Sequence, residues 1–186
     1  MTHSVCRGDG ADGEFEYFQR LWSRLLDPET DFATKLEETF AAESAEFDLP
    51  YAFLSRIDRN DRTQRIQIAH GSHDLLQPGE TAPLGRTYCR KTIADPEGSM
   101  AVSDAPAEGW TDDPAYETFG LGSYLGTTVT TDDGLYGTLC FASSEPRAEA
   151  ITDREVARAG MLGRWASYDL APDASRTTGP EPGTPG

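Results

Sequence analysis

The sequence predicts an α+β domain, a central antiparallel β-sheet with N- and C-terminal helices on one of its faces. Apolar residues recur at helical spacing near both ends of the region 14–171. Between these ends lie short apolar or alternating runs that are separated by turn-forming residues. Helices at the ends and strands grouped between them are typical of an antiparallel sheet that helices cover on one face.

Two helices are expected before the first strand. The segment 14–26 carries an apolar stripe at spacings of three and four residues, and Pro28 ends it. A second helix is expected to begin at Thr30 or Asp31, which are both good N-cap residues, and to end before Pro50. The two apolar faces are Phe15, Phe18, Trp22 and Leu25, and then Phe32, Leu36, Phe40 and Phe47.

The expected strands are residues 51–58, 64–69, 99–103, 124–130 and 135–142. The polar run RNDRT separates the first two strands, which indicates a hairpin. A second hairpin is expected around Asp133-Gly134, since Asp-Gly supplies the positive φ of tight turns. A capping box, Thr152 to Glu155, opens a final helix with Val156, Ala159, Leu162 and Ala166 on its apolar face. The segment 71–123 has only weak signals, and such long loops are usually functional.

The domain is expected to span residues 14–171, between disordered tails at 1–13 and 172–186 that are polar or rich in Pro and Gly. No run approaches the ~20 apolar residues of a membrane span, and no secretion signal is present, so we expect a cytoplasmic protein without membrane contact. Cys6, Cys89 and Cys140 lack CxxC spacing, which favours reduced thiols over disulfides or a zinc site.

The formal net charge is −16, with 16 basic and 32 acidic residues. Such a charge repels nucleic-acid phosphates, so we expect no direct binding to nucleic acid. Almost all basic residues are arginine, since Lys35 and Lys91 are the two lysines. Strong acidity with scarce lysine is typical of halophilic proteins, in which salt screens the self-repulsion.

Four segments in this order resemble the GAF domain family. They are TYCRKTI at 87–93, MAVSDAP at 100–106, SYLG at 123–126 and GLYGTLCF at 134–141, and the resemblance covers 32–170. It implies a GAF/PAS-like fold in which the irregular middle segment roofs a ligand pocket on the face away from the terminal helices. It also implies a sensor of a small molecule or of redox state that often dimerises through its terminal helices, but it does not identify the ligand.

Some GAF subclasses fit the residues poorly. The lysine-containing signature of cyclic-nucleotide binders has no counterpart, and Cys89 is followed by Arg90 where bilin-attaching members usually have histidine. No cofactor is identified. The partners that we expect are a small-molecule ligand of unknown identity, a signalling protein in trans such as a kinase or a transcription regulator, and a second copy bound through the terminal helices.

The predicted ligand-binding residues combine aromatic side chains with a few polar groups, as a pocket requires. They are Tyr88, Cys89, Arg90, Met100, Asp104, Trp110, Tyr116, Phe119 and Tyr124. Arg90 beside Cys89 could lower the pKa of the thiol, although a free cysteine is more often a small buried apolar residue. Cys140 is interpreted as core, and His70 with His73 as a solvated loop because two histidines rarely suffice for a metal site.

Three functions remain open. The first is a sensory domain in signal transduction that acts on a partner, and this interpretation assigns no catalytic residue. The second is a thiol-dependent reductase of a small oxidised metabolite, similar to free methionine sulfoxide reductase. The third is an interaction or dimerisation module with a filled pocket. Sequence motifs of phosphate loops, zinc proteases, serine hydrolases and kinases are absent.

Overall fold

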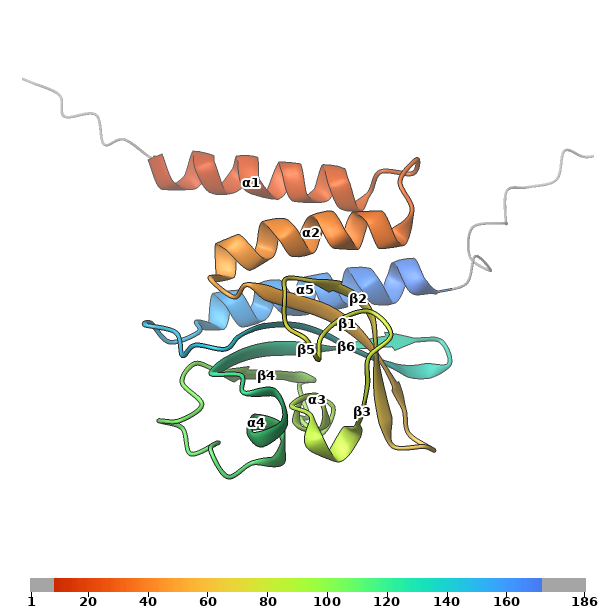
Figure 1. Cartoon of the computed structure of the whole chain (residues 1–186). Helices are drawn as coiled ribbons and strands as arrows, with labels where there is room; N and C mark the ends of the chain where they lie inside the picture. Colours follow the sequence, from red (N-terminus) through yellow and green to blue (C-terminus); the bar gives the residue numbers. More distant parts are fainter. Residues whose placement is uncertain (1–8, 172–186) are drawn as a thin grey trace, which may run out of the picture.

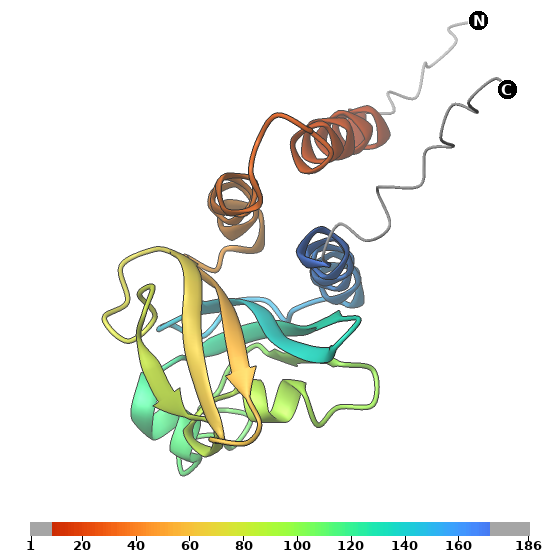
Figure 2. The same ribbon diagram turned by 90° about the vertical axis from the view of Figure 1, so that its right-hand side faces the viewer.

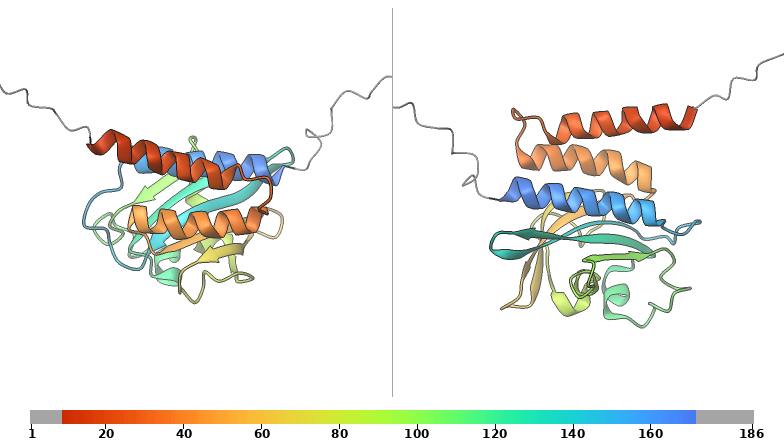
Figure 3. Two further views of the ribbon diagram at one scale, coloured as in Figure 1. Left: turned by 90° about the horizontal axis from the view of Figure 1, so that it is seen from above. Right: turned by 180° about the vertical axis from the view of Figure 1, so that it is seen from behind.

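The computed structural model describes residues 9–171, in which three long helices cover one face of a six-stranded sheet (Figure 1). These helices are α1 (Asp9–Leu25), α2 (Phe32–Phe47) and α5 (Asp153–Leu170). Seen nearly end-on, α2 and α5 lie beside the sheet and α1 lies outside them (Figure 2). The views from above and from behind show the three helices running alongside one another (Figure 3).

The sheet is entirely antiparallel, with strand order β3-β2-β1-β6-β5-β4. Its strands are β1 (Tyr51–Asp58), β2 (Thr63–His70), β3 (Thr81–Pro83), β4 (Ser99–Val102), β5 (Ser123–Thr131) and β6 (Gly134–Ser143). Pairing of β1 with β6 joins the two hairpins at the centre. Gly137 permits this pairing, since a Cβ there would overlap the carbonyl oxygen of Ser55.

The larger core lies between the helices and the sheet. Its buried side chains include Leu36, Phe40 and Phe47 of α2 and Leu162 of α5, as the helical spacing predicts. Phe141 of β6 is the centre of an aromatic group: its ring centroid lies 5.7 Å from that of Phe40 and 4.8 Å from that of Phe47, both edge to face. These contacts fix α2 against the middle of the sheet.

The outermost helix packs differently from the expectation. Leu21 and Leu25 are buried, while Phe15 and Trp22 remain 64% and 38% exposed. The expected stripe was therefore wrong for Phe15 and Trp22. The physical reason is that α1 rests on α2 rather than on the sheet, which leaves only a narrow strip of the helix to cover. Trp165 of α5 fixes the end of α1 by donating from its indole N–H to the Leu25 carbonyl at 3.2 Å.

The middle segment covers the other face of the sheet. It contains a 3₁₀ turn (Leu84–Arg86), α3 (Cys89–Thr92) and α4 (Pro114–Phe119), which lie below the sheet in Figure 1, and it also supplies the edge strands β3 and β4. A second core of buried residues lies here, and it includes Tyr88, Cys89, Tyr124 and Cys140. Successive strand residues point to opposite faces, so Cys140 belongs to this core and its neighbour Phe141 to the first.

The predicted fold class is confirmed: the structure has an antiparallel sheet with the terminal helices on one face and the irregular middle segment on the other. The strand 51–58 has the predicted bounds, and the other predicted strands differ by one residue at either end. Asp31 caps α2, and both hydrogen bonds of the Thr152 capping box form. Sequence reasoning missed β3, α3 and α4, which are too short for a repeating pattern to be recognised.

Most of the two expected tails lies outside the described residues, and α1 begins at Asp9, before the expected residue 14. Among residues 9–171, no helix has both the length and the apolar character that crossing a bilayer requires.

Candidate functional site

Two thiols meet in the core beneath the sheet. Cys89 is the first residue of α3, and Cys140 lies near the middle of β6. Their sulfur atoms are 3.9 Å apart, and both side chains are fully buried. A disulfide has an S–S distance of about 2.05 Å, so an approach of roughly 2 Å would join them. The fold thus places two cysteines that are distant in the sequence within reach of one bond.

A chain of hydroxyl groups connects the thiols to the sheet. The Thr138 hydroxyl lies 3.1 Å from Cys89 Sγ, to which it donates, and 2.8 Å from the Ser55 hydroxyl. Thr138 and Cys140 are two residues apart on β6 and therefore share a face. Ser55 on β1 pairs in register with Thr138, which brings the two hydroxyls together. The cysteines therefore sit in a polar cluster within an otherwise apolar core.

Tyr124 completes this cluster from β5. Its hydroxyl oxygen lies 3.1 Å from Cys140 Sγ, 3.7 Å from Cys89 Sγ and 2.9 Å from the Thr92 hydroxyl. Gly126 makes this position available, because a Cβ at residue 126 would overlap the Tyr124 hydroxyl. Because Gly126 has no side chain, the phenol hydroxyl can lie beside both sulfur atoms.

The surroundings give the two thiols different pKa values. Burial raises the pKa of the Cys89 thiol, but hydrogen bonds from Cys140, Thr138, Tyr124 and Ser55 outweigh burial and hold this pKa at about 7. Burial and the neighbouring Cys89 raise the pKa of Cys140 well above its usual value. Burial, followed by the charges of Cys140 and Cys89, does the same to the pKa of Tyr124. The pKa of Cys89 thus lies below that of Cys140, so Cys89 loses its proton first, as the attacking thiol does in thiol–disulfide chemistry.

The space beside this cluster is small. A cavity of about 10 Å³ lies between the sheet and the middle segment. Such a volume suits a single water molecule. Gln64 contributes a buried side-chain oxygen that has no hydrogen-bond partner among the described residues. The lining residues are Phe53, Gln64, Leu76, Thr87, Tyr88, Cys89, Phe119, Leu121 and Tyr124.

Four of the predicted ligand-binding residues, Tyr88, Cys89, Phe119 and Tyr124, come together around this cavity. The Tyr88 ring stacks on Tyr124 with centroids 5.1 Å apart, and its hydroxyl donates to the Leu121 carbonyl at 3.1 Å. Burial, followed by the charges of Asp113 and Tyr116, raises the pKa of Tyr88.

The other predicted residues lie outside the cavity. Trp110 packs against the Tyr88 ring at 5.4 Å, and Met100 and Tyr116 are half-buried at the edge of the second core. Asp104 accepts a hydrogen bond from the Ala107 N–H and so holds a local turn.

Arg90 does not act on the thiol as the sequence suggested. Its guanidinium donates to the Asp113 carboxylate at 2.5 Å and to the Thr87 carbonyl at 2.7 Å. This ion pair, together with burial that opposes it, leaves the pKa of Asp113 below its usual value. The low pKa of Cys89 comes instead from its hydrogen-bonded neighbours. Arg90 therefore joins α3 to the N-terminus of α4.

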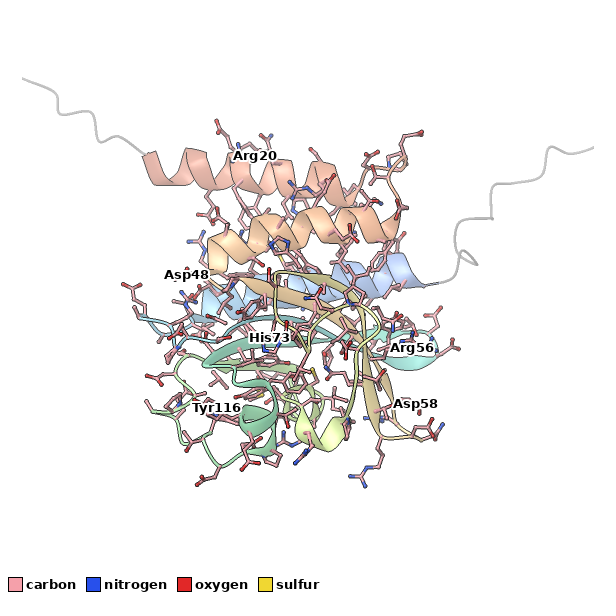
Figure 4. All side chains as sticks on the ribbon, in the orientation of Figure 1. Arg20, Asp48, Arg56, Asp58, His73 and Tyr116 are labelled. Atoms are coloured by element: carbon pink, nitrogen blue, oxygen red, sulfur yellow. The ribbon has the colours of Figure 1, made fainter. Side chains whose placement is uncertain are left out.

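His73 has a structural role. Its Nε2 lies 2.9 Å from the Phe119 carbonyl oxygen and its Nδ1 accepts from the Leu75 N–H at 3.2 Å, which engages both ring nitrogens. The ring also packs edge to face on Tyr51. His73 is half-buried, and Figure 4 labels it near the middle of the view, above α4. Within residues 9–171, no group of three or more His, Cys, Asp or Glu side chains is placed to hold a metal ion.

Sequence reasoning missed most of the polar cluster. Cys140 was interpreted as core alone, and Ser55, Gln64, Thr92 and Thr138 were not selected. The alternation of β6 does place Thr138 and Cys140 on one face, which is a usable signal. Thr138 and Cys140 lie close to Cys89 because the middle segment folds back over the sheet. The local sequence pattern does not predict this contact.

Comparisons with known proteins agree with this architecture. The family model of the GAF domain matches residues 31–170. The solved free methionine-R-sulfoxide reductase of Neisseria meningitidis, in complex with its substrate, is similar at TM-score 0.63 and 19% identity, over 91% of this chain and 94% of that one. A phycoerythrobilin-bound GAF domain of a cyanobacterial phytochrome is similar at TM-score 0.65 and 11% identity, over 86% and 95%.

A relative by sequence is the diguanylate cyclase DgcP of Escherichia coli, which is 29% identical over 122 residues. The match covers 63% of this chain and 35% of that protein, so this chain spans about a third of its relative.

Proposed function

Because the chain belongs to the GAF domain family, we propose that it is a sensory and regulatory domain whose signal is the oxidation of Cys89 and Cys140 to a disulfide. The observation that carries this proposal is the 3.9 Å separation of the two sulfur atoms. The division of protonation states supports it, since a thiolate at Cys89 is a nucleophile and the Cys140 thiol can resolve the intermediate.

A peroxide would supply the oxidising equivalents. The Cys89 thiolate attacks one peroxide oxygen, the O–O bond breaks, and after protonation the products are a sulfenic acid on Cys89 and water. Cys140 sulfur then attacks the Cys89 sulfur, and the S–O bond breaks to release a second water. The two thiols lose two electrons and two protons in total, and the peroxide gains them.

The size of the cavity favours redox state over a large ligand as the signal. Its ~10 Å³ suits a single water molecule, and Gln64 offers an unused acceptor there. A bilin or a metabolite of similar size would have to displace Tyr88 or Phe119 from the sheet. A thiol that lines such a cavity is exposed selectively to small oxidants during local opening.

We place the output in a partner protein in trans, a kinase or a transcription regulator, and expect the protein to form a homodimer. The exposed face of α1 supports the dimer, because Phe15 and Trp22 of this helix and Leu26 directly after it are each at least 38% exposed. An apolar patch of this kind is typical of an interaction surface.

A thiol-dependent reductase is the second candidate, favoured by the same thiol pair and by likeness to the Neisseria enzyme. Two thiols would reduce a sulfoxide to a sulfide, with release of water and formation of one disulfide. The small cavity speaks against it, because a methionine sulfoxide exceeds the space present. Turnover of free methionine sulfoxide with a thiol reductant would favour the reductase, and disulfide formation without turnover would favour the sensor.

The test uses the full chain with Cys6→Ser, so that two thiols remain. The protein is treated with hydrogen peroxide, denatured, alkylated and weighed by mass spectrometry. We expect both thiols to become blocked together by one intramolecular disulfide and to be freed by reductant. Matched Cys89→Ser and Cys140→Ser variants should form none.

The order of reaction distinguishes the roles of the two thiols. In Cys140→Ser the sulfenic acid should accumulate on Cys89 and react with a dimedone-type trap, while Cys89→Ser should give little trapped product. Independent oxidation of both cysteines to sulfonic acids without any disulfide would contradict the proposal, provided circular dichroism shows that the variants are folded.

A further inference from the structure

The β1–β2 hairpin carries arginines that the fold does not use. Arg56, Arg59, Arg62 and Arg65 are all exposed, and within residues 9–171 none of them lies within 4 Å of a carboxylate oxygen. The sequence has twice as many acidic as basic residues, so an arginine can easily find a local acidic partner. Four exposed arginines without one, in a single hairpin, require another explanation.

Two of these arginines stand directly opposite each other. Arg56 of β1 pairs in register with Arg65 of β2, so both side chains leave the same face of the sheet. Like charges opposite each other destabilise a strand pair. The side chains lie on the helix-covered face, where Leu54 is buried, but at the end of β1 that the helices leave open. Figure 4 places Arg56 and Asp58 at this end, by the β5–β6 turn.

These side chains line a groove of about 710 Å³, a volume within the usual range of small-ligand sites. Neutral hydrogen-bonding groups surround the arginines, and two acids, Asp58 and Asp133, complete the wall. Asp58 turns toward the hairpin, where one carboxylate oxygen accepts the Asn60 and Asp61 N–H groups at 2.8 and 3.0 Å. The lining residues are Arg56, Ile57, Asp58, Arg59, Asn60, Thr63, Arg65, Gln67, Thr81, Asp133, Gly134 and Leu135.

We propose that this groove binds a small organic diphosphate. A guanidinium pairs with phosphate oxygens through two parallel N–H donors, and an anion between Arg56 and Arg65 would offset their mutual repulsion. Arg59 at the tip of the hairpin provides positive charge for a second phosphate. Thr63, Gln67 and Thr81 supply neutral partners for the hydroxyl or carbonyl groups of the organic part.

The Tyr136 ring restricts the position of the Arg56 side chain. The Arg56 guanidinium carbon lies 5.8 Å from the centroid of the Tyr136 ring, which restricts the side chain before any anion binds. Arg56 and Arg65 lie on the opposite face of the sheet from Cys89 and Cys140, so the proposed thiol chemistry uses neither arginine. A nucleic-acid strand is disfavoured because the net charge of −16 would repel its many phosphates.

Isothermal titration calorimetry at constant ionic strength tests the proposal, with inorganic pyrophosphate and ADP as probes. We expect saturable binding of both at one site per chain. Arg56→Gln and Arg65→Gln should each weaken binding by about tenfold or more, since each removes a charge-assisted hydrogen-bonding group. Arg86→Gln is the matched control, because Arg86 is also exposed but does not line the groove, and it should bind within about twofold of the wild type.

Two results would overturn the proposal. One is the absence of binding to either probe at millimolar concentration in a protein that circular dichroism shows to be folded. The other is binding that Arg56→Gln and Arg86→Gln weaken equally, which would indicate non-specific ion pairing. Binding of a glutamate-rich peptide in place of both diphosphates would also contradict it and would assign the groove to an acidic protein segment.

Discussion

At the scale of single residues, the chemistry of the thiol pair depends on neighbours that can be removed one at a time. Thr138 donates its hydroxyl hydrogen to Cys89 sulfur at 3.1 Å, and the Tyr124 hydroxyl lies beside both sulfur atoms. Both of these neighbours of Cys89 are uncharged hydroxyl groups. A buried thiolate here depends on dipoles of the core rather than on a cation, which makes it sensitive to the loss of one hydroxyl.

We predict that Thr138→Val raises the pKa of Cys89 above its value of about 7, because it removes an O–H donor and keeps the shape of the side chain. The pH profile of peroxide-driven disulfide formation measures this, with its rise moved to higher pH. Thr138→Ser is the matched control and should restore the wild-type profile. An unchanged profile in Thr138→Val would show that this hydroxyl does not set the pKa.

The same ionisation affects stability in a defined direction. The folded pKa of Cys89, about 7, lies below the ordinary value of 9.0, so the thiolate stabilises the fold above pH 9 and this contribution is lost as the pH falls through 7. Relative to Cys89→Ser, the wild type should therefore gain unfolding free energy between these two pH values. Urea titrations of both proteins, kept reduced, measure the difference.

At the scale of elements, α2 and α5 are joined by a buried ion pair. Arg158 Nε lies 2.6 Å from Glu43 Oε2, and the Glu43 side chain has no exposed surface. Burial raises the pKa of Glu43 in spite of the opposing effect of Arg158. The Arg158 guanidinium also lies over the Tyr17 ring of α1 at 3.9 Å, so one side chain touches all three covering helices.

We expect Arg158→Met to lower the unfolding free energy by about 3–5 kcal/mol at neutral pH, because a buried carboxylate loses its partner. The loss should shrink as the pH is lowered, since Glu43 then folds in its protonated form. Chemical denaturation at two pH values measures both effects. The double variant Glu43→Met/Arg158→Met is the control and should recover most of the stability; a double variant as unstable as the single one would contradict this explanation.

The exposed face of α1 gives a second prediction at this scale. Trp22→Glu should convert the expected homodimer to a monomer, because it places a charge in the apolar patch. Sedimentation velocity measures the change. Leu75→Glu is the matched control, since Leu75 is 42% exposed but lies in the middle segment, and it should leave the dimer intact. A wild type that stays monomeric at high micromolar concentration would count against an α1 interface.

Sequence patterns predicted well those helices and strands that are long enough for their apolar pattern to be recognised. The stripe of α2 from Leu36 to Phe47 and the capping box at Thr152 identify their helices directly. The short apolar run in 51–58 does the same for β1. By contrast, α3 has four residues and β3 three, so neither is long enough for its pattern to repeat. The pairing of β4 with β5 depends on tertiary contacts, so the local sequence of 99–103 does not predict its register.

For the candidate site, the sequence identified the side chains of the middle segment better than those of the sheet. Tyr88, Cys89, Phe119 and Tyr124 were selected because aromatic and thiol groups in a long loop suggest a pocket. Cys140 was not selected, since a cysteine between two large apolar residues is usually core. Cys140 does belong to the core, but it also lies next to Cys89. Only the three-dimensional structure reveals this neighbour.

At the scale of the whole molecule, charge is the dominant feature. With a formal charge of −16, the folded chain brings acidic groups together that the unfolded chain keeps apart. Ion pairs such as Arg147–Glu155, at 2.7 Å, relieve only part of this repulsion. Folding therefore increases electrostatic repulsion, and dissolved salt screens it.

We predict that the melting temperature rises as KCl is increased to molar concentration, with most of the gain reached once screening is complete. Differential scanning calorimetry across a KCl series measures it. Sucrose at matched osmolality is the control for general exclusion from the protein surface and should give a smaller rise. Equal melting temperatures in dilute buffer and in molar KCl would count against the proposed adaptation to salt.

The alternation of β6 links the two sides of the molecule through one peptide bond. Cys140 faces the thiol cluster, and Phe141, the next residue, is held between Phe40 and Phe47 of α2. A strand that shifts to let Cys140 approach Cys89 cannot leave Phe141 in place. Oxidation of the thiols would therefore displace the backbone of β6, and this displacement would move the side chain that contacts α2. No chain of intermediate side chains is needed, because the two faces of the sheet share one backbone.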